Sequence, residues 1–186
     1  MRIISGSMRG TKLFTLEGLN TRPTLDRVKE SLFNILNLKL EDAIVLDLFA
    51  GSGALSLEAL SRGAKKAILC DSSNQAVSII KKNIEKTKTQ DKTILLQMNY
   101  EKALEKLKSE KEKMNLVFLD PPYDSDFAED ASKKIIQFDL LENNGIIIIE
   151  TDQKEKVLKN TDKELLEIYD IRKYGRVSLI FLKRKG

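Results

Sequence analysis

Short apolar runs alternate along the chain with longer amphipathic segments. The runs predict strands over 43–47, 66–71, 93–98, 114–119 and 145–150, because stretches of this length that are rich in β-branched residues are typical of strands buried on both faces. The intervening segments at 54–60, 73–88, 101–113 and 125–138 carry apolar residues at helical spacing. This regular alternation predicts an α/β fold with a mostly parallel sheet and right-handed crossovers.

The two ends of the chain add to this pattern. Residues 1–22 alternate short apolar runs with Gly, Arg and Lys, which predicts a small β-hairpin arm preceding a main domain over 23–186. After Pro23, one helical face is formed by Leu25, Val28, Leu32, Ile35 and Leu36. Residues 163–184 are predicted as two long strands that turn near Gly175 and add an antiparallel strand to the sheet.

The composition fits one globular domain. A chain of 186 residues, 41% apolar and 32% charged, can bury one core but not two of ordinary size. No apolar stretch reaches the length of a membrane span, and the single Cys70 and absent His exclude an internal disulfide and imidazole metal ligands. We therefore expect a cytoplasmic monomer without a metal. The net charge of +4 fits a polyanionic partner, although an ordinary solvated lysine-rich face has the same charge.

A glycine-bracketed turn connects the first predicted strand to a helix. Asp47 ends the strand, and the turn that follows contains Phe49, Ala50, Gly51, Ser52 and Gly53. A strand, glycine turn and helix in this order place backbone N–H groups at the carboxyl end of the strand, where open α/β sheets bind ligands. Ser56 replaces the third glycine of a dinucleotide fingerprint, so a diphosphate cofactor is not indicated. S-adenosylmethionine (SAM), whose amino group and sulfonium are positive, fits Asp47 better.

Polar residues follow the ends of four predicted strands. They are Asp47, Asp71, Asn99 and Asp120, and in a doubly wound sheet these ends line one crevice. Asp71 has the position of a carboxylate that accepts hydrogen bonds from ribose hydroxyls, and Asn99 is placed to accept from an adenine amino group. Each residue taken alone has an alternative interpretation as a helix cap. The four together with the turn predict a nucleoside-type cofactor, which here is SAM.

The segment Asp120-Pro121-Pro122-Tyr123 gives the sharpest chemical signal. Two prolines fix the backbone, so the carbonyls and the Asp120 carboxylate point in set directions. A planar exocyclic amine needs two acceptors on its N–H groups before its nitrogen can attack a methyl group. Asp120 and the Pro121 carbonyl are candidates for these acceptors, while Tyr123 is expected to stack on the base. The alternative is a rigid loop with a capping Asp.

The N-terminal arm carries candidate RNA contacts. Arg2, Arg9 and Lys12 supply positive charge next to glycines that allow tight turns, and Arg22 follows near the start of the next helix. These four residues are predicted to contact RNA phosphates. An ordinary capping hairpin explains the same sequence equally well.

Several motifs together resemble class I SAM-dependent methyltransferases that methylate amines. They are the Asp47–Gly53 turn, Asp71 and Asp120-Pro-Pro-Tyr. Arg9-Gly10 and the segment 22–34, Arg-Pro-Thr-x-Asp-Arg-Val-Lys-Glu-Ser-Leu-Phe-Asn, narrow the resemblance to the RsmD family. That family methylates guanine N2 in bacterial 16S ribosomal RNA, so the resemblance implies a seven-stranded sheet, SAM as cofactor, and the small ribosomal subunit or its 16S rRNA as partner.

Two positions depart from the family pattern, and two other functions stay open. Asn99 stands where the family usually has Asp, and Asp71 where Glu is commoner. One alternative is an amino-methyltransferase for adenine N6 in DNA or RNA, or for a protein glutamine, since such enzymes use similar Pro-Pro-aromatic loops. The other is a non-catalytic RNA-binding module, which an intact Asp120-Pro-Pro-Tyr disfavours.

Overall fold

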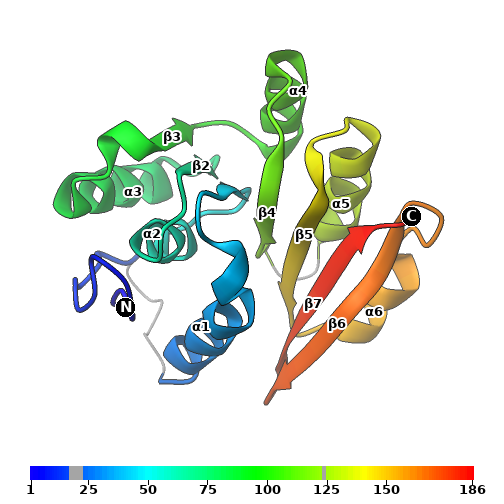
Figure 1. The fold of residues 1–186 in the computed structure, drawn as a ribbon, viewed down its shortest axis with the longest axis horizontal. Helices are drawn as coiled ribbons and strands as arrows, with labels where there is room; N and C mark the ends of the chain where they lie inside the picture. Colours follow the sequence, from blue (N-terminus) through cyan, green and yellow to red (C-terminus); the bar gives the residue numbers. More distant parts are fainter. Residues whose placement is uncertain (17–22, 123–124) are drawn as a thin grey trace.

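A computed structural model describes residues 1–16, 23–122 and 125–186. Within these residues, seven strands form one sheet in the order β3-β2-β1-β4-β5-β7-β6 (Figure 1). The strands are β1 (Ile44–Asp47), β2 (Lys66–Cys70), β3 (Thr93–Leu96), β4 (Met114–Leu119), β5 (Leu141–Thr151), β6 (Leu166–Tyr174) and β7 (Val177–Arg184). β1 to β5 pair in parallel, and β7 pairs antiparallel with both β5 and β6. The predicted sheet is therefore confirmed.

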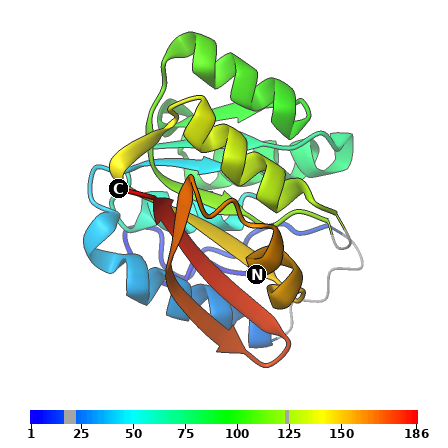
Figure 2. The same cartoon turned by 90° about the vertical axis from the view of Figure 1, so that its right-hand side faces the viewer.

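Helices cover both faces of this sheet (Figure 2). One apolar core receives buried side chains from α1 (Pro23–Leu36), α2 (Ala54–Ser61) and α3 (Asn74–Thr87), and the other from α4 (Tyr100–Glu110), α5 (Phe127–Gln137) and α6 (Lys154–Asn160). Short 3-10 turns, η1 (Asn37–Lys39) and η2 (Gln90–Lys92), precede β1 and β3. Successive strand residues alternate between the cores: Val45 belongs to the first and Leu46 to the second. The central strands β1, β2 and β4 are apolar along most of their length because both of their faces are covered.

Three details differ from the sequence-based expectations. β5 begins at Leu141, whereas the sequence predicted a start near 145. The earlier start was missed because the first residues of β5 include the exposed Asn143 and Asn144, which look like a loop in the sequence. Helix α6 was not predicted, since Val157 is the one buried residue in its short charged sequence. Ile35 was placed on the buried face of α1 but is 38% exposed, because it lies at the edge of the arc of buried positions.

The described part of the N-terminal arm, residues 1–16, closes on itself next to α2 (Figure 1). Within these residues one antiparallel bridge joins Arg2 to Lys12, and the Ile3 N–H donates to the Thr11 carbonyl at 3.0 Å. The arm is therefore hairpin-like, with too few ladder hydrogen bonds to form regular strands. Among the described residues, no helix is long and apolar enough to cross a membrane.

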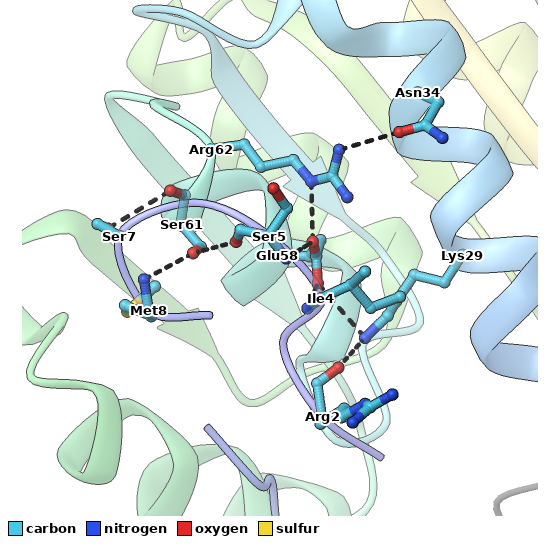
Figure 3. A network of polar contacts seen from close by, with 10 residues as sticks. All are labelled: Arg2, Ile4, Ser5, Ser7, Met8, Lys29, Asn34, Glu58, Ser61 and Arg62. Carbon is cyan, nitrogen blue, oxygen red and sulfur yellow. Dashed lines mark hydrogen bonds and ion pairs between the residues drawn. The ribbon is translucent and has the colours of Figure 1, made fainter. Parts of the chain in front are cut away.

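A buried carboxylate on α2 holds this arm against the main domain (Figure 3). Glu58 is fully buried, and its carboxylate accepts backbone hydrogen bonds from Ile4 at 2.8 Å and from Ser5 at 3.1 Å. Arg62 and Lys29 form ion pairs with the same carboxylate at 2.8 and 3.5 Å. A buried charge is tolerated only when it is paired and hydrogen-bonded. The arm supplies two of the hydrogen bonds that stabilise this buried charge, so it packs as an integral part of the domain.

The last turn of α2 makes a second contact with the arm. Gly6 has a φ of +84°, and a Cβ atom at this position would lie 1.8 Å from the Ser61 carbonyl oxygen. The Ser7 N–H donates to that carbonyl at 2.8 Å, and the Ser61 hydroxyl donates to the Ser5 carbonyl at 2.6 Å (Figure 3). Glycine is required at position 6 because the two backbones approach this closely.

Candidate active site

A cavity of about 820 Å³ opens at the carboxyl ends of the central strands. Asp47, Asp71, Asn99 and Asp120, the four predicted strand-end residues, all line it. So do Phe49, Ala50, Gly51 and Ser52 of the turn, together with Pro121 and Pro122. The structure thus brings most of the predicted site together, at the position where open α/β sheets bind ligands. Tyr123 lies outside the described residues.

The glycine turn is shaped by two residues with positive φ. Gly51 has a φ of +57° and Gly53 of +77°, values that residues other than glycine rarely adopt. Gly53 also packs closely, because a Cβ atom there would lie 3.0 Å from the Leu69 side chain. Gly53 does not line the cavity; it is the N-cap of α2. Its role is to let the turn fold so that Gly51 and Ser52 line the cavity.

Asp71 is hydrogen-bonded to backbone on both sides. One carboxylate oxygen accepts from the Gly51 N–H at 2.9 Å, and the other accepts from the Ser73 N–H at 2.9 Å. These bonds fix the carboxylate at the cavity wall, where each oxygen keeps a free lone pair. Both oxygens remain available as acceptors, and the contact of Asp71 with ribose hydroxyls stays a prediction.

Asp47 is the most deeply buried acid of the site. It is 1% exposed, and the Ser56 hydroxyl donates to its carboxylate at 3.1 Å. Burial raises the pKa of Asp47 to about 7, with repulsion from Asp120 and Asp71 acting in the same direction. A cationic group in the cavity would oppose both effects. Ser56, which replaces the third glycine of a dinucleotide fingerprint, thus serves to orient this carboxylate.

Asn99 shows the alternative role that its sequence position allowed. Its side-chain oxygen accepts from the Lys102 N–H at 2.9 Å and caps the N-terminus of α4. It also lines the cavity. The helix cap holds the amide at the cavity edge, and the prediction that it contacts adenine is untested.

An aromatic cluster forms the wall beside Asn99. Of its three members, only Phe49 was predicted from the sequence. Phe49 stacks on Phe127 with ring centroids 6.2 Å apart, and Tyr100 lies 5.1 Å from Phe127. All three rings line the cavity. Tyr100 is held by a hydrogen bond from its hydroxyl to Asp130 at 2.8 Å. Each of the two missed residues begins a helix after a strand-end loop, a position that could have identified them.

Asp120 follows β4 and is exposed toward the cavity. Desolvation by the surrounding protein raises the pKa of Asp120 above its usual range, and the charge of Glu150 raises it further. Glu150, near the end of β5, also lines the cavity and was not among the predicted site residues. The pKa of Glu150 is raised by burial as well. The site therefore contains two neighbouring carboxylates.

Three of the predicted RNA-binding residues lie on the described part of the arm. Arg2, Arg9 and Lys12 are exposed, and none forms an ion pair with any residue that the structure describes. Arg22 lies outside the described residues. Met1, Thr15 and Leu16 line the cavity itself, so the arm forms part of the cavity wall.

Known proteins resemble the chain over nearly its whole length. It is 36% identical over 169 residues to the ribosomal RNA small subunit methyltransferase D of Haemophilus influenzae, covering 90% of this chain and 86% of that protein. It is 39% identical over 145 residues to the protein of the same name from Escherichia coli, covering 78% and 68%.

The fold has a close match among solved structures. A structure described as "Putative methyltransferase yhhF from Escherichia coli" superposes with a TM-score of 0.85 at 30% identity, covering 100% of this chain and 98% of that one. The arrangement of the sheet is thus that of class I methyltransferases. A family model described as Conserved hypothetical protein 95 matches residues 1–183, and the chain belongs to this family.

Proposed function

We propose that the chain transfers a methyl group from SAM to the exocyclic N2 amine of a guanine in 16S ribosomal RNA. One observation carries the proposal: Asp120, Pro121 and Pro122 line the same cavity as the glycine turn and Asp71. An amine-acceptor loop therefore faces a nucleoside-type cofactor site across a single space. Relatives named as small subunit rRNA methyltransferases support the choice of RNA.

The residues of the cavity suit the parts of SAM. Asp71 would accept from the ribose hydroxyls, as its strand-end position and fixed carboxylate suggest. Asp47, held by Ser56 in a buried setting, would face the positive end of the cofactor. The rings of Phe49 and Phe127 offer apolar surface for the adenine, with Asn99 at its edge. SAM supplies an electrophilic methyl group on a sulfonium.

The guanine must leave its stack or base pair to enter the cavity. Its N2 lone pair is delocalised into the ring, so Asp120 and the Pro121 carbonyl would accept from the two N–H groups and draw electron density to nitrogen. With SAM bound, the amine would attack the methyl group, S-adenosylhomocysteine would be the leaving group, and the methylated nitrogen would then lose its proton to solvent. The sequence contains no His. No histidine is needed as a base, because the neutral amine attacks before its proton leaves. Asp120 acts by orientation and by stabilising developing positive charge.

The exposed cations of the arm would hold the RNA. Arg2, Arg9 and Lys12 have no ion-pair partner in the described part of the chain, so phosphate groups would not have to displace one. The arm also borders the cavity through Thr15 and Leu16. Phosphate contacts there would bring the target nucleotide to the cavity mouth.

A methyl-transfer assay with tritiated SAM tests the proposal. The substrates are unmethylated small ribosomal subunits, free 16S rRNA, DNA and a release-factor protein. We expect label in the rRNA alone, as N2-methylguanosine after digestion to nucleosides. Label in DNA or in glutamine would overturn the assignment of the substrate, and SAM binding without transfer to any of them would indicate a non-catalytic module.

A further inference from the structure

Glu150 lies beside Asp120 at the carboxyl edge of the sheet. β4 and β5 are parallel neighbours, and their last paired positions are Leu119 and Ile149. Asp120 follows Leu119, and Glu150 follows Ile149. The two carboxylates therefore extend from adjacent positions about 5 Å apart across the strands. Both line the large cavity.

Neither carboxylate is satisfied by the rest of the protein. Among residues 1–16, 23–122 and 125–186, no hydrogen bond or ion pair involves the side chain of Asp120 or of Glu150. Their oxygens are not sealed from the cavity either, since Asp120 is exposed and Glu150 has no fully buried unpaired atom. The cation that shares the cavity, Lys29, is engaged with Glu58 and the Arg2 carbonyl.

Two adjacent unpaired carboxylates are unfavourable in the absence of a donor. Desolvation raises the pKa of both groups, and the charge of Glu150 raises the pKa of Asp120 further. A purely structural pair would be expected to have a cation or backbone N–H groups nearby, as Asp71 and Glu58 do. The pair is better explained as a set of acceptors that a ligand with several N–H donors completes.

We propose that Glu150 accepts a hydrogen bond from guanine N1–H and so selects guanine as the base to be methylated. This inference rests on the proposed function. Guanine presents three donors along one edge, N1–H and the two hydrogens of N2. Asp120 and the Pro121 carbonyl take the N2 hydrogens, which leaves N1–H for the neighbouring carboxylate.

The arrangement separates guanine from other bases that carry amines. Adenine and cytosine present a ring-nitrogen acceptor next to their amine, which would face the Glu150 carboxylate with lone pair against lone pair. A site built to hydrogen-bond an N–H group rejects analogues without it, because its polar group is left unpaired. 2-Aminopurine is the decisive analogue, since it keeps the C2 amine of guanine but has an unprotonated N1.

The test compares guanine with 2-aminopurine at the target position of a synthetic RNA, by single-turnover methyl transfer. For wild type we expect a strong preference for guanine. Glu150→Gln can donate to the 2-aminopurine N1, so we expect the guanine-to-2-aminopurine rate ratio to fall by about 10- to 100-fold, the scale of a charged hydrogen bond. The intrinsic reactivity of the two amines cancels when this ratio is compared between variants.

Asp152→Asn is the matched control, because it removes one negative charge two residues further along and does not line the large cavity. It should keep the wild-type ratio, and SAM affinity measured by calorimetry should be unchanged in both variants. A Glu150→Gln variant that binds SAM normally and keeps the wild-type ratio would overturn the inference. If wild type methylates no RNA guanine at all, the proposed function fails instead.

Discussion

The Gly51 N–H donates to the Asp71 carboxylate at 2.9 Å, so the glycine turn and the acid at the end of β2 form one unit. Asp71→Ala should therefore lose the ribose contact and also loosen the turn. We expect SAM affinity to fall by roughly 1–3 kcal/mol or more, the scale for hydrogen bonds to a charged group. Calorimetric titration with SAM checks this, with Asp91→Ala on the exposed η2 turn as control. Equal affinities in the two variants would contradict the assignment of Asp71.

Asp120→Ala should slow the chemical step while leaving SAM binding nearly intact. Loss of one preorganised charged partner lowers the methyl-transfer rate by about 10²–10⁴. Single-turnover kinetics on the RNA substrate measure the rate without contributions from product release. Asp120→Asn, which keeps one acceptor oxygen, should recover part of it. Transfer at near the wild-type rate in the Ala variant would mean that the loop is only scaffolding.

The stability of the ligand-free protein should depend on pH through Asp47. Its folded pKa of about 7 lies above the usual value near 4, so the folded state binds the proton more tightly. The stability contribution is complete below pH 4 and is lost as pH rises toward 7. At roughly 1.4 kcal/mol per pKa unit, the loss is on the order of a few kcal/mol.

Asp47→Asn removes that titration. Relative to wild type, the variant should gain stability at pH 8 and show a flatter dependence between pH 4 and 7, by urea denaturation without SAM. The same variant should bind SAM more weakly, because the carboxylate that faces the positive end is gone. Parallel stability curves for the two proteins would show that Asp47 does not carry a raised pKa.

The arm should determine how steeply RNA binding depends on salt. Replacing Arg2, Arg9 and Lys12 by Ala removes up to three phosphate contacts, and each contributes about 0.7–0.9 to the slope of log affinity against log salt. SAM affinity should stay at the wild-type value. Lys102, Lys159 and Lys163, exposed on α4 and around α6, form the matched control triple. If both triples change the slope equally, binding follows net charge and the arm is no specific RNA contact.

Much of the site could be predicted because its residues lie at positions that the strand pattern itself defines. Asp47, Asp71, Asn99 and Asp120 each follow an apolar run, and parallel strands end at one edge. Glu150 has the same kind of position on β5, but the glutamate looks like an ordinary polar strand end. Its significance depends on Asp120 lying beside it, and strand order is not visible in the local sequence.

The tertiary environment of charged helix residues was equally hard to predict. Lys29 is 5% exposed, although a lysine in the middle of an amphipathic helix is normally solvated. Glu58 lies within the predicted 54–60 helix and is fully buried. The arm supplies backbone partners to both, the Arg2 carbonyl to Lys29 and the Ile4 and Ser5 N–H groups to Glu58. These contacts join segments that are 27 and more than 50 residues apart, respectively.

That separation also sets an order of assembly. Ile4 and Ser5 are synthesised first, yet their shared acceptor Glu58 follows 54 and 53 residues later. The arm cannot make these bonds until α2 has been synthesised and has folded. The part of the cavity wall that Met1, Thr15 and Leu16 provide is therefore added only after α2 has formed. During synthesis, the first residues of this enzyme therefore reach their native position only after α2 has formed.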